Sequence, residues 1–264
     1  MNAGNIVSVG IMALALSTLC FSAQAASVNL VSNGNFETYT GGYNGAPSQL
    51  GNSGTGGYTA LTGWDVGAGS SGTYGFLFAE GANSTTGSQS QRWGSTTFNL
   101  WGPGTGGGNV ANGLTAASPS GGNFVALDAD STLRGNGISQ IITGLTIGQK
   151  YHLEFEWAAA QQKNFRGPTT EQVQVSFGAS TQATAIFNLP DQGFSGWMTQ
   201  SMDFFADSTT QTLRFLALGT PNGLPPFVLL DGVTLTVPEP ESYALLGIGL
   251  LAMMLATGRR NPRA

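Results

Sequence analysis

Apolar and polar residues alternate along several segments in the second half of the chain. Between positions 150 and 157 every second residue is apolar: Tyr151, Leu153, Phe155 and Trp157. The positions on the other face are polar: His152, Glu154 and Glu156. A period of two predicts a β-strand with one buried face. Similar patterns predict further strands at 123–128, 137–142, 173–177, 212–218 and 228–235.

The first half of the chain is less regular. Segments 40–57 and 66–122 are rich in Gly, Ser, Thr and Asn, with short aromatic groups between them. These groups predict short strands joined by long loops, with their tryptophans either in the core or on a binding rim. No helix is predicted between the two ends. We therefore expect an all-β fold, an antiparallel β-sandwich of the jelly-roll type over 26–236 with long Gly-rich loops at 66–122.

An apolar run at 6–21 is followed by a small-residue segment that ends in Ala25 and Ala26. This order predicts a helical signal peptide over 1–25, cut by signal peptidase between Ala25 and Ala26. A retained membrane helix is the alternative. The only cysteine, Cys20, lies in the run, so the mature chain is expected to lack disulfide and thiol chemistry. The predicted destination is outside the cytoplasm.

The other end has three parts in series. The sorting motif Pro238, Glu239 and Pro240 precedes an uncharged stretch at 243–257, and the basic residues Arg259 and Arg260 follow. The prolines stop regular structure, and the uncharged stretch is helical by composition. A plain C-terminal membrane anchor would also have such a stretch.

The order of these parts over 237–264 resembles the PEP-CTERM sorting signal of Gram-negative bacteria. The resemblance implies that an exosortase recognises and cuts the motif. The protein would first be anchored transiently in the inner membrane through 243–257. It would then pass to the cell surface or to an extracellular polysaccharide matrix.

Charge is scarce and mostly negative. The chain has 9 Lys plus Arg against 14 Asp plus Glu, a net charge of -5 at pH 7. Nucleic acids and anionic membrane surfaces require a clustered basic face, so this balance argues against both as partners. Glycine accounts for 40 of the 264 residues, roughly twice the usual share of about 7%. This composition fits a loop-rich β-protein.

Several short motifs resemble the galactose-binding-like jelly rolls of carbohydrate-binding modules and of many PEP-CTERM surface proteins. They are found at 30–37, 63–64, 122–128, 138–140 and 229–233. The resemblance implies a structural calcium ion bound by Glu37, the carbonyl of Asn35 and Asp231. Taken alone, Glu37 could cap a turn and Asp231 could begin one. No other cofactor is expected.

Two groups of residues are candidates for carbohydrate chemistry. Aromatic rings bind the C–H faces of sugars, which makes Trp93, Trp101 and Trp64 candidate glycan contacts. The polar face with His152, Glu154 and Glu156 is the only titratable cluster, and a hydrolase would have to use it. Neighbours on one strand rarely flank a sugar bond from two sides, so a solvated face or a polar groove lining is preferred.

The sequence thus predicts an exported, non-enzymatic protein with a structural or adhesive role and weak glycan binding. One alternative is a glycan-active hydrolase. The other is a self-assembling surface-layer subunit, which requires an exposed strand edge.

Overall fold

The computed structural model describes residues 28–67, 74–81, 85–88, 97–130 and 137–238, together with Gly249 and Met253. The predicted signal peptide with Ala25 and Ala26 lies outside the described residues. So do Glu239, Pro240, Arg259 and Arg260. Within 243–257 only Gly249 and Met253 are described, and both have helical backbone. Among the described residues, no helix is long and apolar enough to cross a membrane.

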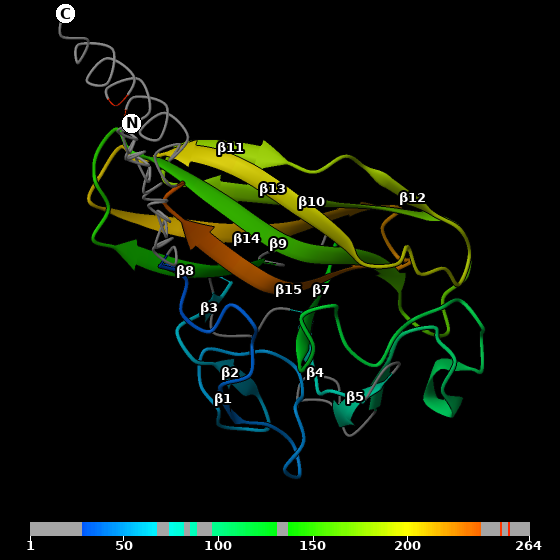
Figure 1. Cartoon of the computed structure of the whole chain (residues 1–264). Helices are drawn as coiled ribbons and strands as arrows, with labels where there is room; N and C mark the ends of the chain where they lie inside the picture. The colour runs from blue at the N-terminus through cyan, green and yellow to red at the C-terminus, as the bar shows by residue number, and fades with distance from the viewer. Residues whose placement is uncertain are drawn as a thin grey trace, which may run out of the picture.

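The strands form two main antiparallel sheets. One sheet contains β4 (Gly75–Phe78), β7 (Phe124–Asp128), β9 (Lys150–Gln161), β13 (Met198–Phe205) and β15 (Pro226–Thr236). The other contains β3 (Asp65–Val66), β8 (Gly137–Thr143), β10 (Thr169–Phe177), β11 (Ser180–Ala183), β12 (Phe187–Leu189) and β14 (Thr210–Thr220). Neighbouring strands follow the orders β13–β9–β15–β7–β4 and β11–β10–β14–β8–β3, and β12 pairs with β10. The sheets pack as a β-sandwich, which confirms the predicted fold class (Figure 1).

Alternation along the strands produces the core between the sheets. The four apolar residues predicted to share one face of β9 are all buried, as is every second residue of β10. The inward positions of both sheets meet in one cluster that includes Leu127, Phe155, Trp157, Val173, Phe177, Phe204, Phe215 and Leu230. Burying each such side chain stabilises the fold by about 1.5–3 kcal/mol before conformational entropy is counted.

A second apolar cluster covers the outer face of the sheet that contains β9. It includes Phe76, Phe78, Phe98, Leu100, Leu114, Phe124, Phe227 and Leu229. Phe76 and Phe98 stack with ring centroids 3.8 Å apart and planes 7° apart. Because the sheet is covered on both faces here, β7 and the first half of β15 are continuous buried runs rather than alternating ones.

The Gly-rich first half contains short elements, as predicted. These are β1 (Tyr39–Gly41), β2 (Thr59–Leu61), β5 (Thr85–Ser88), β6 (Thr97–Asn99) and a 3-10 turn at Thr105–Gly107. The first pair forms one small two-stranded sheet and the second pair another.

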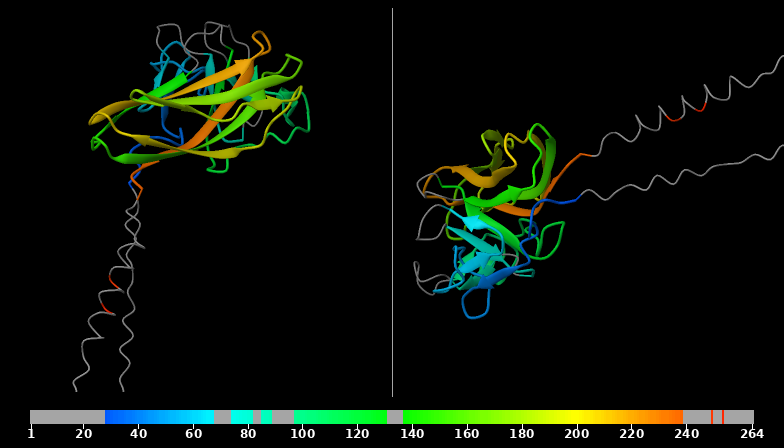
Figure 2. Two further views of the ribbon diagram at one scale, coloured as in Figure 1. Left: turned by 90° about the horizontal axis from the view of Figure 1, so that it is seen from above. Right: turned by 90° about the vertical axis from the view of Figure 1, so that its left-hand side faces the viewer.

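The described chain begins and ends at the same end of the sandwich. The backbone N–H of Leu30 donates to the carbonyl of Leu235 at 2.8 Å, and Asn29 Oδ1 accepts from the N–H of Leu235 at 2.9 Å. Figure 2 shows the first residues of the described chain and the end of β15 leaving the domain side by side. The loops at 162–168 and 190–197 lie at the opposite end, because they follow β9 and precede β13.

Candidate functional site

Three carboxylates accept hydrogen bonds from the loop 118–123. Asp231 Oδ2 accepts from Ser118 Oγ at 2.5 Å, Glu156 Oε2 accepts from the N–H of Ser120 at 3.0 Å, and Glu37 Oε1 accepts from the N–H of Asn123 at 2.6 Å. Asp231 and Glu156 are cross-strand partners on β15 and β9. We call Glu37, Glu156 and Asp231 the carboxylate site.

Asp231 is the buried member of the carboxylate site. Its side chain is inaccessible to solvent, and Oδ1 has no hydrogen-bond partner. Burial is the main cause that raises the pKa of Asp231 to about 7; the negative charges of Glu156 and Glu37 add to this rise, and the hydrogen bonds from Ser118 and Gly232 oppose it. A cation beside Oδ1 would relieve both effects.

The backbone around the carboxylate site departs from regular structure. Asp231 and Gly232 do not begin a turn, which was one interpretation of the sequence. They lie at a register shift in the pairing of β15 with β9, and Gly232 has a φ of +59°. Asp231 lies on the outer face of the sheet beside Glu156, and after the bulge Val233 and Leu235 point into the core between the sheets. Asn35 is exposed in the turn that leads to Glu37.

The carboxylate site offers ligands of the kind that calcium prefers, since this ion takes six to eight hard oxygens from carboxylates, carbonyls and water. Asp231 Oδ1 is an orphaned buried acceptor, and the carboxyl of Glu37 and the carbonyl of Asn35 belong to the adjoining turn. Glu156 adds a third carboxylate, although the sequence pattern groups it with His152 and Glu154. Among the described residues, no group of three or more His, Cys, Asp or Glu side chains is arranged to hold a metal ion. A calcium ion here would therefore depend on carbonyl and water oxygens as well.

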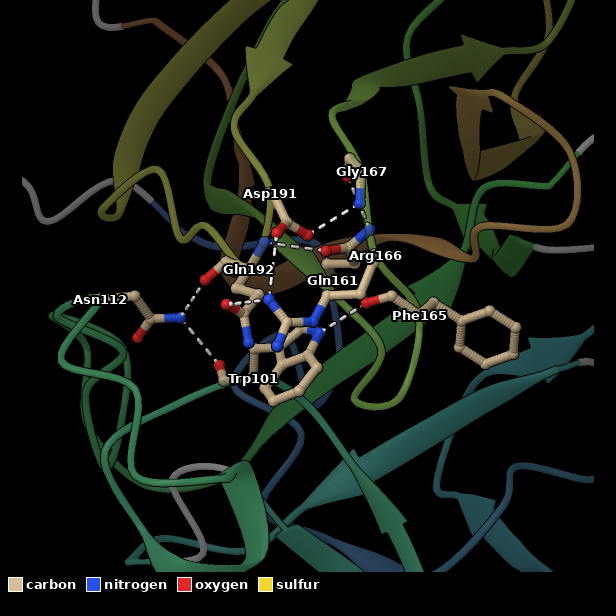
Figure 3. Close-up of polar contacts among 8 residues, drawn as sticks. All are labelled: Trp101, Asn112, Gln161, Phe165, Arg166, Gly167, Asp191 and Gln192. Atoms are coloured by element: carbon tan, nitrogen blue, oxygen red, sulfur yellow. Dashed lines mark hydrogen bonds and ion pairs between the residues drawn. The ribbon is translucent and has the colours of Figure 1, made fainter.

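A second polar cluster lies at the end of the sandwich opposite the chain ends (Figure 3). The guanidinium carbon of Arg166 lies 5.2 Å from the centroid of the Trp101 ring. Arg166 Nη1 donates to Gln192 Oε1 at 2.8 Å and to Asp191 Oδ2 at 3.3 Å. The side chain of Arg166 is nonetheless 65% exposed. We call Trp101, Arg166, Asp191 and Gln192 the loop-end cluster.

Amide side chains hold this cluster in place. Asn112 Nδ2 donates to the carbonyls of Trp101 and Gln192, which ties two loops together. Gln161 at the end of β9 accepts from the N–H of Gln192 and donates to the carbonyl of Gly167. These bonds hold the loops around Arg166, whose guanidinium donates through Nη1 to both Asp191 and Gln192.

Two of the tryptophans predicted to contact glycans, Trp101 and Trp64, are buried in the structure. Trp101 is only 8% exposed, because Gly108 covers one part of its ring and Nε1 donates to the carbonyl of Phe165 at 2.8 Å. Trp64 is a core residue that packs against Phe36 and Phe215. Neither presents an open ring face to a ligand. Trp93 lies outside the described residues.

The polar side chains on the outer face of β9 lie in two different environments. His152 Nδ1 lies 2.7 Å from Asp203 Oδ1, and Lys150 Nζ lies 3.0 Å from Asp203 Oδ2. These side chains are about 40% exposed, and the hydrogen bonds from His152 and Lys150 lower the pKa of Asp203. Glu154 is exposed, whereas Glu156 belongs to the carboxylate site. The three residues therefore do not form one cluster.

Solved structures that are similar to this chain include carbohydrate-binding modules and an adhesin domain. A family 61 carbohydrate-binding module in complex with β-1,4-galactotriose is 11% identical, with a TM-score of 0.35, and the match covers 80% of this chain and 100% of that chain. A CBM22 xylan-binding domain from Paenibacillus barcinonensis is 12% identical, with a TM-score of 0.35 and coverages of 81% and 97%.

A cleaved adhesin domain of Lys-gingipain from Porphyromonas gingivalis is also 12% identical, with a TM-score of 0.38 and coverages of 67% and 92%. The sugars named for these structures are ligands of those proteins. No curated protein matches this chain.

The family model described as the PEP-CTERM protein-sorting motif matches residues 236–260. The match begins at the last residue of β15, so the sandwich leads directly into the matched segment. The chain therefore carries a PEP-CTERM sorting motif, which marks it as an exported protein sorted to the cell surface or the extracellular space.

Proposed function

We propose that this protein is a non-enzymatic, exosortase-processed surface or matrix protein of a Gram-negative bacterium, and that its sandwich binds polysaccharide. The observation that carries the sorting part is the direct passage from β15 into the matched motif at 236–260. In this scheme 243–257 anchors the precursor in the inner membrane, and an exosortase cuts near Pro238, Glu239 and Pro240.

Intact mass and location in hosts with and without the exosortase test the sorting scheme. With the enzyme, the chain is expected to begin at Ala26, to lack the residues after Pro240 and to leave the membrane fraction. Without it, the chain is expected to keep its C-terminal residues and remain in the membrane. The same C-terminus in both hosts would show that the motif is not processed.

Polysaccharide binding is assigned to the loop-end cluster. The indole of Trp101 and the side chains of Asp191 and Gln192 hold the guanidinium of Arg166 while leaving it largely exposed. A guanidinium has five N–H donors, and a fixed one loses little entropy on binding hydroxyl or carboxylate groups. Arg166, rather than the covered indole, is therefore the expected sugar contact.

Binding of the purified chain to extracted exopolysaccharide tests this assignment. Arg166→Ala is expected to weaken binding at least tenfold, whereas Arg214→Ala is a matched control because Arg214 lies on an outward position of β14. Equal binding by both variants would exclude the loop-end cluster as the sugar site.

We also propose that the carboxylate site holds a structural calcium ion through Glu37, Asp231 and the carbonyl of Asn35, with Glu156 close by. The ion would supply positive charge between carboxylates that otherwise repel one another. It would join the turn before β1 to β15 and the loop 118–123 without taking part in any reaction. The orphaned Oδ1 of Asp231 is the observation that favours it.

The two alternative functions have less support. A hydrolase acting through His152, Glu154 and Glu156 needs these groups around one sugar bond, but His152 pairs with Asp203 and Glu156 with the loop 118–123. A surface-layer subunit needs a free strand edge. β11 is an exposed edge, but Gln182 on it donates to the carbonyl of Asp203 on β13, which links the two sheets on this side. Concentration-dependent oligomers of the full chain would favour that alternative.

A further inference from the structure

Large apolar side chains are exposed mainly at one end of the sandwich. Four of them surround the place where the described chain begins and ends: Val28 (73% exposed), Ile147 (64%), Phe205 (61%) and Val237 (40%). In the described part of the sandwich, the other large exposed apolar residues are Ile141 on β8 and Ile186 beside the β11 edge. We call the first four the exit patch.

Strand pairing places the members of the exit patch at the same end. Phe205 is the cross-strand partner of Lys150 at the start of β9, and Thr236 is the partner of His152 two residues further on. The N–H of Gly148 donates to the carbonyl of Ala206, which brings the loop of Ile147 beside the end of β13. Val237 directly follows β15.

The sequence after Pro238 keeps this end close to any membrane that holds 243–257. Five residue steps separate Pro238 from Tyr243, and a fully extended chain spans about 17 Å over that distance. The headgroup region of one leaflet takes up roughly 5–8 Å of it. The exit patch thus faces the bilayer at short range, and such tethering makes even a weak apolar contact effective.

We propose that the exit patch docks on the phospholipid surface while the precursor is anchored, and so holds the sorting motif against the membrane. This inference rests on the anchored intermediate of the proposed function. The contact is apolar rather than electrostatic, because Lys150 is paired with Asp203 and the nearby Asp207 is negative. An apolar contact of this kind is compatible with the net charge of -5, which argues against electrostatic attraction to anionic membranes.

The experiment uses the precursor that begins at Ala26 and therefore has no cysteine, purified from a host without exosortase and placed in phosphatidylethanolamine–phosphatidylglycerol vesicles. A polarity-sensitive probe is attached at Ile147→Cys or at the matched control Ile186→Cys. Lipids that carry a nitroxide serve as quenchers. The Ile147 probe is expected to shift to the blue and to lose at least half of its emission, whereas the Ile186 probe is expected to resemble one in water.

The outcomes separate the docking from the anchoring. A chain that floats with the vesicles while both probes remain in water overturns the docking alone. A chain that does not float with them overturns the anchored intermediate and the docking together. A probe at Ile147 that is shielded only when exosortase is present assigns the exit patch to the enzyme and overturns the lipid contact.

A second measurement does not depend on a probe. In the vesicle-bound chain, Ile147→Ser combined with Phe205→Ser is expected to speed cleavage of the linker after Glu241 by a glutamate-specific protease, by fivefold or more. The control Ile186→Ser should leave the rate unchanged. Equal cleavage rates for the double variant and the unsubstituted chain would count against the docking.

Discussion

The α-carbon of Gly122 faces the carboxyl group of Glu37 so closely that a Cβ on Gly122 would overlap Glu37 Oε1. Gly122 has a φ of +74°, and the next residue, Asn123, donates its N–H to the same carboxyl group at 2.6 Å. Glycine thus allows the loop 118–123 to reach the carboxylate site.

Replacing Gly122 with Ala is therefore expected to destabilise the fold more than the same change at Gly113. Gly113 has a φ of +87° with nothing within 4 Å of its added Cβ, so Gly113→Ala costs only the backbone strain of about 1–2 kcal/mol. Gly122→Ala adds the loss of a charged hydrogen bond, about 1.5–3 kcal/mol. Urea denaturation of both variants measures the difference, and equal losses would contradict the assigned contact.

Calcium is expected to stabilise the protein through Asp231. For an extracellular site with a Kd near 10⁻⁴–10⁻³ M, 10 mM calcium should add roughly 1.4–2.7 kcal/mol to the free energy of unfolding. Asp231→Asn should abolish the calcium-dependent rise in Tm, whereas the exposed control Asp203→Asn should keep it. A full rise in Tm in the Asp231 variant would place the ion elsewhere.

The calcium effect is also expected to depend on pH. Without calcium, the folded Asp231 keeps its proton up to a pKa of about 7, whereas the unfolded carboxyl loses it near 4. Stability therefore falls as pH rises from about 4 to 7. Because a proton competes with the ion for this carboxyl, the calcium-induced rise in Tm should be larger at pH 8 than at pH 6. Melting curves at both pH values test the sign.

The sequence pattern predicts strands best where one face meets the core and the inward residues are apolar. It finds β9 over 150–157 because each inward position is apolar there. It misses the start of β10, because the inward positions Thr169 and Glu171 are polar although they are buried. It misses β13 as well, since the inward Gln200 of this edge strand interrupts the apolar alternation.

The candidate sites are less predictable than the strands. The carboxylate site depends on the pairing of β9 with β15, which brings Glu156 beside Asp231 across 75 residues, and alternation within one strand does not specify its partner. The resemblance to jelly rolls indicated Glu37 and Asp231 but not Glu156. Likewise, nothing in the local sequence around Arg166 indicates that the loop at 190–192 will hold it.

Removing the indole of Trp101 is expected to affect stability, whereas removing the guanidinium of Arg166 is not. Trp101 is 8% exposed and anchors the loop after β6 through Nε1, so Trp101→Ala should cost about 3–5 kcal/mol. The pair between Arg166 and Asp191 is exposed, and such pairs contribute at most about 1 kcal/mol. Denaturation of both variants checks this, and a large loss in Arg166→Ala would make its weaker sugar binding a folding effect.

Glu171 is expected to make the protein less stable as pH rises. Its carboxyl group is buried on the inward face of β10, where Oε1 accepts from Thr169 Oγ1 and Oε2 has no hydrogen-bond partner. Burial raises the pKa of Glu171 to about 8. In the unfolded chain the group ionises near pH 4.5, so the folded state alone binds the proton between about pH 4.5 and 8, and stability falls across that window.

The amide of Glu171→Gln cannot ionise and still accepts the Thr169 hydrogen bond, so this variant should lose the Glu171 contribution to the pH dependence. Relative to the unsubstituted protein, its free energy of unfolding is expected to rise by several kcal/mol, at most about 5, between pH 5 and pH 9. Glu154→Gln on the exposed face of β9 serves as the control and should follow the unsubstituted protein. Parallel pH profiles for Glu171→Gln and the unsubstituted protein would mean that Glu171 is ionised in the folded state, with a counter-charge that the packing around β10 does not provide.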